Sequence, residues 1–189
     1  MPDPTPWTIA ANGAETVVET FGYLTSVIDG YDGAEQRVQL REVPFGSLEF
    51  SILAIDQEAP LAQSLIYGLH DEVLVVPWWQ YGSRLTGAVS IGATLLPIAD
   101  ALDVPYRRGA TTTDYALVIA DAFNWELFVA SGVLATGVQT SDTATKNWAA
   151  GSAMVYPARA ARLSDAPAVR WLTPSILEAR LKFTAEQGA

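Results

Sequence analysis

The amino-acid sequence predicts an all-β protein with one helix: a β-sandwich domain that carries an inserted small β-barrel-like domain. Stretches in which apolar and polar residues alternate recur along the chain, which is typical of strands with one face in the core. Only one segment has convincing helical spacing. Glycine, proline, asparagine and aspartate separate the stretches at intervals typical of a sandwich or a barrel.

The first long strand is expected within residues 15–28, ETVVETFGYLTSVI. Its β-branched and aromatic residues favour a strand, with a possible kink at Gly22. Two Asp-Gly pairs follow in Asp29–Gly33, and glycine supplies the positive φ that hairpin turns need. A calcium loop would require oxygen ligands at its third and fifth positions, where this chain has Tyr31 and Gly33. We therefore expect a hairpin corner without a cation.

An antiparallel hairpin is expected over residues 36–55, with VPFG as its turn. Its second arm places Leu48, Phe50 and Ile52 on one face. The closing segment SILEARLKFTAE, from Ser175, alternates in the same way. We expect it to be a strand that pairs with this hairpin.

The helix is expected over residues 56–69, DQEAPLAQSLIYGL. Its acidic start complements the helix dipole, and Pro60 fits in a first turn. Leu61, Leu65 and Leu69 recur every four residues, which predicts a leucine stripe packed against the sheet.

Short strands are expected from residue 73 onward. They are VLVVPWW, LTGAVS, ATLLPIA, DYALVIAD, WELFVAS and SAMVYPARAARL. Since the closing strand should return to the first hairpin, we expect residues 1–76 and 164–189 to form one sheet-and-helix domain. Residues 77–163 then form the barrel-like insertion.

The composition restricts the function classes. The formal net charge is −10, whereas a dedicated nucleic-acid binder is expected to be basic. There is no cysteine, which excludes disulfides and thiolate chemistry. The N-terminus lacks the pattern of a signal peptide, and no apolar run approaches the roughly 20 residues of a membrane-spanning helix. Only 17% of the residues are charged, which indicates either a large core or surface buried against other subunits.

No catalytic, cofactor-binding or metal-ligating residue is predicted. The one histidine, His70, is expected to be a favourable charge at the helix C-terminus rather than a catalytic base. Neither a nucleophile-elbow pattern nor a phosphate-binding glycine loop occurs. The 21 Asp and Glu residues leave a carboxylate-dependent hydrolase as a distant alternative, but their spacing indicates no pair.

Two sets of residues are candidates for binding. Trp78, Trp79 and Tyr81 could stack on sugar rings, but neighbouring strand residues point to opposite faces, so one tryptophan is expected in the core and the other at the surface or an interface. Trp125 and Trp148 are expected to be ordinary barrel packing. The uneven arginines could dock an acidic patch on a neighbouring copy or could simply be solvated; they are Arg107, Arg108, Arg159, Arg162 and Arg170.

Three stretches together resemble the distal tail-like family of tail-tip proteins from long-tailed bacteriophages. They are DGAEQRVQLRE from Asp32, NWAAGSAMVYPARAARLSD from Asn147, and SILEARLKF from Ser175. The segment VPFGS, which contains Phe45 and Gly46, departs from the more basic sequence that the family tends to have after its Leu-Arg pair.

The resemblance implies a non-enzymatic virion protein of the tail tip or baseplate, made in the bacterial host cytoplasm. It implies a homo-oligomer, a hexameric ring that joins the tail tube to the hub and tail-fibre or receptor-binding proteins, without cofactors, membrane contact or specific nucleic-acid binding. The alternative is a carbohydrate- or receptor-binding β module that uses Trp78, Trp79 and Tyr81.

Overall fold

The structure is a computed structural model that describes residues 4–22, 25–29, 35–39, 45–68, 72–99, 114–164 and 166–185. Within these ranges the chain is mostly strand with a single α-helix. The prediction of an all-β protein with one helix is therefore confirmed.

The helical elements are α1 (Glu58–Gly68) and the short 3-10 helix η1 (Trp79–Tyr81). The strands before α1 are β1 (Thr5–Pro6), β2 (Val18–Gly22), β3 (Thr25–Asp29), β4 (Glu35–Gln39) and β5 (Phe45–Ile55). The strands after it are β6 (Leu74–Pro77), β7 (Ser83–Arg84), β8 (Leu95–Pro97), β9 (Asp114–Asp121), β10 (Asn124–Leu134), β11 (Gly137–Thr140), β12 (Met154–Leu163), β13 (Val169–Thr173) and β14 (Ile176–Ala185).

The longest ladder joins β5 to β14, antiparallel from Ile55↔Ile176 to Ser47↔Thr184. Because directly opposite residues share one side of a sheet, the register separates this ladder into two faces. The inner face consists of buried pairs: Leu48↔Phe183, Phe50↔Leu181, Ile52↔Ala179 and Ala54↔Leu177. The predicted alternation of both segments and their mutual pairing are thus confirmed.

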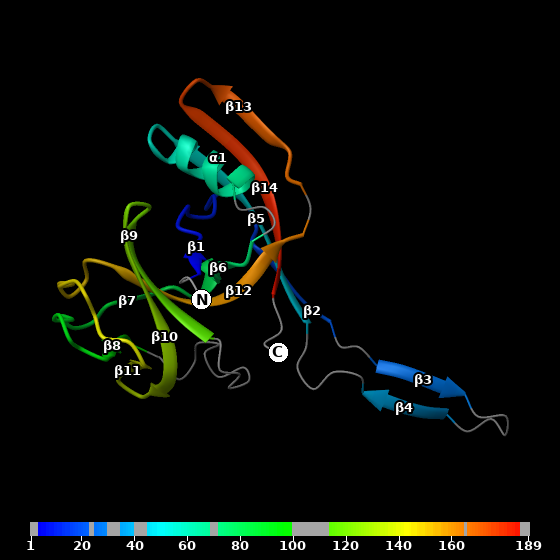
Figure 1. Cartoon of the computed structure of the whole chain (residues 1–189), viewed down its shortest axis with the longest axis horizontal. Coiled ribbons are helices and arrows are strands. Elements are labelled where there is room, and N and C mark those ends of the chain that lie inside the picture. Colours follow the sequence, from blue (N-terminus) through cyan, green and yellow to red (C-terminus); the bar gives the residue numbers. More distant parts are fainter. Residues whose placement is uncertain are drawn as a thin grey trace.

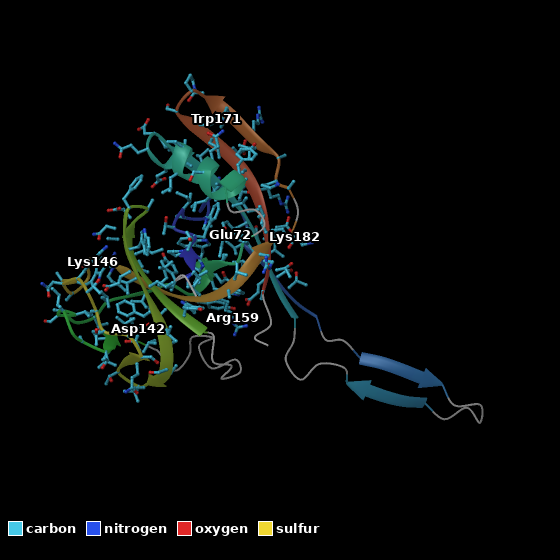
Figure 2. All side chains as sticks on the ribbon, in the orientation of Figure 1. Glu72, Asp142, Lys146, Arg159, Trp171 and Lys182 are labelled. Carbon is cyan, nitrogen blue, oxygen red and sulfur yellow. The ribbon has the colours of Figure 1, made fainter. Side chains whose placement is uncertain are left out.

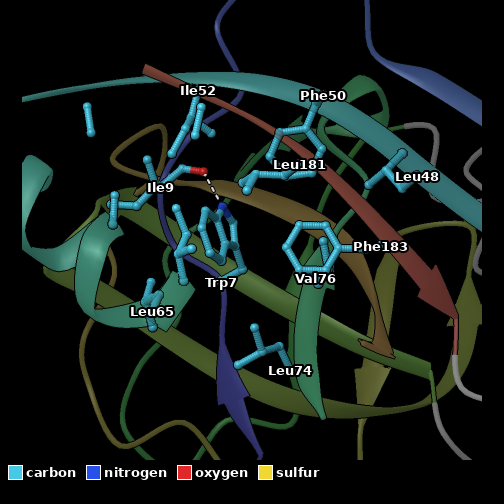
Figure 3. Close-up of a cluster of buried hydrophobic side chains, with 14 of the residues drawn as sticks. Trp7, Ile9, Leu48, Phe50, Ile52, Leu65, Leu74, Val76, Leu181 and Phe183 are labelled. Carbon is cyan, nitrogen blue, oxygen red and sulfur yellow. Dashed lines mark hydrogen bonds between the residues drawn. The ribbon is translucent and has the colours of Figure 1, made fainter. Parts of the chain in front are cut away.

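The first core lies between this ladder and the N-terminal segment (Figure 3). Trp7 is fully buried, with its ring centroid 5.4 Å from that of Phe183 and 6.5 Å from that of Phe50. Its indole N–H donates to the carbonyl oxygen of Ile9 at 2.8 Å, so the polar atom of this large ring is satisfied inside the core. Strand β1 runs parallel to β6 beside it, and α1 closes one end (Figure 1).

The second core lies inside a closed circuit of strands. β12 pairs with β9, β9 with β10, β10 with β11, and β11 with β8. β7 pairs with β12, and the single bridge Leu85↔Ile98 closes the circuit between the ends of β7 and β8. The buried side chains within it are Leu85, Val89, Leu96, Ile98, Ala116, Val118, Phe128, Val138, Ala144, Trp148, Ala153 and Val155. Such closure pairs strand edges that would otherwise be open.

Strand β12 belongs to both parts of the molecule. Its first residues pair with β9, whereas Ala158–Ala161 pair with β6 and Ala161–Leu163 pair with β14. A continuous sheet of twelve strands therefore runs through both cores. The division into residues 1–76 plus 164–189 and the insertion 77–163 stays a prediction.

The helix begins two residues later than predicted and has a different buried stripe. Pro60 lies in its first turn, as expected. Its buried residues are Ala59, Ala62, Leu65 and Ile66, so that small side chains allow the helix to approach the sheet closely. Leu61 is only half-buried, and Leu69 lies outside the described residues.

The hairpin predicted over residues 36–55 is wrong in its pairing. β4 pairs with β3, from Asp29↔Glu35 to Thr25↔Gln39, while β5 pairs with β2 and β14. The strand predicted over 15–28 is divided into β2, which ends at Gly22, and β3. β3 and β4 form a separate two-stranded sheet that extends away from the rest of the molecule (Figure 1). The antiparallel pairing of β3 with β4 fits a corner between them, although residues 30–34 are outside the described part.

The later strands follow the predicted order with one exception. VLVVPWW, ATLLPIA, DYALVIAD, WELFVAS and SAMVYPARAARL contain β6, β8, β9, β10 and β12. LTGAVS is not a strand, because only Leu85 and Val89 make isolated bridges there, to Ile98 and Trp148. The side chains of these two residues nonetheless fill the second core.

Candidate functional site

The segment after β6 is held by one carboxylate from β2. The indole N–H of Trp78 donates to Glu19 Oε1 at 2.5 Å, and the hydroxyl of Tyr81 lies 3.0 Å from Oε2. The side-chain amide of Gln80 donates to Oε2 at 3.2 Å. The guanidinium carbon of Arg159 lies 5.6 Å from the ring centroid of Trp78, a cation–π distance. This arrangement joins β2, β12 and the η1 turn.

The two neighbouring tryptophans have different environments. Trp78 is 4% exposed and belongs to the first core. Trp79 is half-buried, with its ring 5.0 Å from that of Tyr156 and 6.4 Å from that of Phe50. Burial raises the pKa of Tyr156 above its ordinary value.

This geometry bears on the glycan-platform alternative. A platform for sugar rings needs exposed aromatic faces, and Trp78 offers none. The prediction that one tryptophan is core is confirmed for Trp78. The Nε1 of Trp79 is buried without a hydrogen-bond partner among the described residues. Trp79 and Tyr81 are each half-buried, so the three rings do not form a flat exposed surface.

A second buried carboxylate holds the barrel end together. Glu126 is 7% exposed. Its Oε1 accepts from the backbone N–H and the hydroxyl of Thr145, at 2.5 and 2.7 Å, and its Oε2 accepts from the indole N–H of Trp148 at 2.8 Å. The sequence indicated barrel packing for Trp148 but no role for Glu126, because glutamate in an alternating strand is normally solvated.

The predicted arginines do not gather at one point. Arg159 is half-buried and lies against the ring of Trp78, whereas Arg162 and Arg170 are exposed. Arg107 and Arg108 are outside the described residues. The structure instead brings Arg162 and Arg170 onto one sheet face together with Arg180 and Lys182 of β14.

That surface is the side of β5 and β14 opposite the first core, called the outer face below. Arg170 of β13 lies directly opposite Glu178, and Arg162 of β12 lies directly opposite Thr184, so both arginines belong to this face. Its members are Ser47, Glu49, Ser51, Leu53, Ile55, Arg162, Arg170, Ile176, Glu178, Arg180, Lys182 and Thr184. Ser51 alone among these is buried, at 8% exposure.

The outer face has an apolar end and a charged middle. Leu53 is 38% exposed and Ile55 47%, and Ile55 is directly opposite Ile176. In the charged middle, Arg180 Nε lies 2.6 Å from Glu49 Oε1, and Arg170 Nη1 lies 3.9 Å from Glu178 Oε2. Figure 2 places Trp171 at the far end of this sheet and Lys182 near its middle.

The described residues contain no group of three or more His, Asp or Glu side chains placed to hold a metal ion. His70, the residue considered for catalysis, lies outside them. In the same part of the chain, no helix is long and apolar enough to cross a membrane.

Comparison with known proteins returned no match: no family model and no curated protein sequence is similar to this chain.

Proposed function

We propose that the chain is a structural subunit of the tail tip or baseplate of a long-tailed bacteriophage. It forms a ring, hexameric by the family resemblance, that joins the tail tube to the hub and the tail-fibre or receptor-binding proteins. The support from the sequence is the order of the three stretches that resemble distal tail-like proteins, from Asp32 to Phe183. The chain is then made in the bacterial host cytoplasm and resides in the virion tail.

The observation that carries the proposal is the set of strand edges that stay unpaired within the described part of the chain. Among the described strands, β2 pairs only with β5 and β13 only with β14. Strand edges of this kind recruit other strands unless they are covered. Neighbouring copies in an assembly can cover such edges.

The β3–β4 hairpin supports the same function. It pairs with no other described strand, and in Figure 1 it lies well away from both cores. A two-stranded hairpin by itself is only marginally stable in water. A neighbouring subunit that packs against this arm would stabilise it, which is what a ring of identical subunits provides.

A closed ring satisfies these elements by head-to-tail contacts that repeat around an axis. The formal net charge of −10 then favours a negative lumen, which repels passing DNA and does not bind it. The proposed partners are other copies of the chain, the tail tube and the hub, without specific nucleic-acid binding and without a membrane.

The test is cryo-electron microscopy of the phage particle that encodes this chain. The expected result is a ring of this fold at the distal end of the tail, with the β3–β4 arm against a neighbouring copy. Finding the chain as a monomeric decoration of the capsid, or outside the particle altogether, would contradict the proposal.

A further inference from the structure

The outer face exposes apolar side chains in a region where the opposite side of the same strands is completely packed. Leu53 and Ile55 alternate with the buried Ile52 and Ala54 along β5. Ile176, directly opposite Ile55 on β14, is partly exposed and extends this apolar end. Isolated exposed apolar residues are ordinary, but adjoining ones on a sheet next to an edge strand mark an interaction surface.

The charge of the outer face is opposite to that of the chain. Its cations are Arg162, Arg170, Arg180 and Lys182, and its carboxylates are Glu49 and Glu178. Four cations against two carboxylates leave this face at +2, so with a formal net charge of −10 the rest of the chain carries −12. Four of the eleven Lys and Arg residues of the chain thus lie on one side of three neighbouring strands, β12, β13 and β14.

We propose that the outer face binds a second copy of this chain, head to tail, through the acidic surface of that copy. This deepens the ring proposed above and rests on it. The occupant follows from charge complementarity: the +2 face of one copy fits the −12 remainder of the next. The apolar end at Leu53 and Ile55 supplies the buried area, while the cations set the orientation.

The positive charge of the outer face also favours a head-to-tail contact over a two-fold contact of this face with itself. A two-fold contact of the outer face with itself would bring together two surfaces that each carry a net charge of +2, with Arg170 and Arg180 76% and 70% exposed on each. Like charges placed opposite one another disfavour that contact. A contact between two different surfaces avoids this repulsion and can repeat around a ring.

The first experiment is site-specific photo-crosslinking of the purified full chain at millimolar concentration. A benzophenone amino acid replaces Leu53 on the outer face, and a matched variant carries it at Ile91, which is 63% exposed on the barrel part. We expect crosslinked pairs from position 53 and few from position 91. Peptide mapping of the pair should identify an attachment point outside the outer face of the second copy.

Three results would overturn the proposal. They are no crosslinked pair from position 53, a pair joined through the outer faces of both copies, or crosslinking to co-purified nucleic acid or another acidic polymer in place of a second copy.

The second experiment measures self-association by sedimentation equilibrium. Arg170→Glu should weaken it about tenfold or more, and added salt should weaken wild-type association. Arg84→Glu is the matched control, because it makes the same charge change at an exposed residue on β7, away from the outer face. Equal effects of the two substitutions would show that net charge alone governs association and would overturn the assignment of the face.

Mixing Arg170→Glu chains with wild-type chains gives a further test, because a variant that was merely misfolded would not block the assembly of wild-type chains. In a head-to-tail contact, Arg170→Glu copies keep an intact acidic surface, so they bind wild-type copies and stop further addition. Substoichiometric amounts should therefore reduce wild-type oligomers, and no reduction would contradict the head-to-tail geometry. Thermal unfolding checks the fold, since an ion pair this exposed contributes little to stability.

Failure of this inference and failure of the proposed function are distinguishable. If the chain forms a tail ring but position 53 crosslinks to a different tail protein, the function stands and the assignment of the outer face is overturned. If copies associate through the outer face but the chain is absent from tails, the assignment stands and the proposed function is overturned.

Discussion

Replacing Glu126 tests whether its buried carboxylate holds the barrel end together. Its two oxygens accept three hydrogen bonds, two from Thr145 and one from the indole N–H of Trp148. Trp148 is 4% exposed, so water cannot readily replace the acceptor. The substitution Glu126→Gln keeps the size and shape of the side chain but turns one acceptor oxygen into a donor. Either orientation of the amide then places a donor against a donor.

The expected cost follows from the number of donors left without an acceptor. One buried donor without a partner costs about 1–3 kcal/mol. We therefore expect Glu126→Gln to lower the free energy of unfolding by about 2 kcal/mol, with one donor lost. Glu126→Ala should lower it by about 3 kcal/mol, a modest increase because Thr145 is exposed and water can satisfy its groups.

The assay is urea unfolding followed by tryptophan fluorescence and extrapolated linearly to water. The matched control is Glu178→Gln, whose side chain is 36% exposed and whose ion pair with Arg170 is 3.9 Å long. Exposed pairs contribute about 1 kcal/mol or less. Hydrogen exchange of the Thr145 amide should accelerate in both Glu126 variants and remain unchanged in the control.

The pairing between Glu126 and Trp148 is isolated by a double-mutant cycle with Trp148→Phe. Coupling of about 1–2 kcal/mol is expected for a hydrogen bond to a charged acceptor. A stability loss for Glu126→Gln no larger than that of Glu178→Gln, or coupling near zero, would refute the reasoning.

Three further perturbations have definite expected outcomes. Gly82→Ala should lower the free energy of unfolding by about 1–3 kcal/mol, because the added Cβ would clash with the Tyr156 ring. The control is Gly13→Ala, whose Cβ meets nothing within 4 Å and should have no such effect. Equal denaturant midpoints for the two variants would contradict this prediction. Burial raises the pKa of Tyr156 above 10.0, so this tyrosine ionises more readily in the unfolded chain, and the free energy of unfolding should fall as pH rises above 10.0. Tyr156→Phe should reduce this dependence of the free energy of unfolding on pH. Identical dependences in the variant and the wild type would count against the prediction. Millimolar calcium or a chelator should leave the melting temperature unchanged within about one degree if Asp29–Gly33 is only a corner, since a ligand specific to the fold must stabilise it.

The sequence by itself determined the elements that depend on local periodicity. The alternation of Leu177, Ala179, Leu181 and Phe183 is confirmed by their burial, because successive side chains of a strand point to opposite faces whatever the partner. The helix with Pro60 in its first turn could also be predicted, since the helix start depends on neighbouring residues.

The tertiary structure decided which strands pair and which side chains meet. The alternation around Gln36 and that around Phe50 suit a common hairpin, yet β4 pairs with β3 while β5 pairs with β2 and β14. A period of two specifies the face of a strand but not its neighbour.

The candidate surface required the same long-range information. Arg162, Arg170 and Arg180 belong to three strands and share one side only because the registers of β12 and β13 on β14 bring them together. Likewise, Glu126 meets the indole of Trp148 across 22 residues of sequence, and the barrel closes through one bridge between Leu85 and Ile98. Contacts between distant residues depend on the packing of the whole chain, and no local pattern carries them.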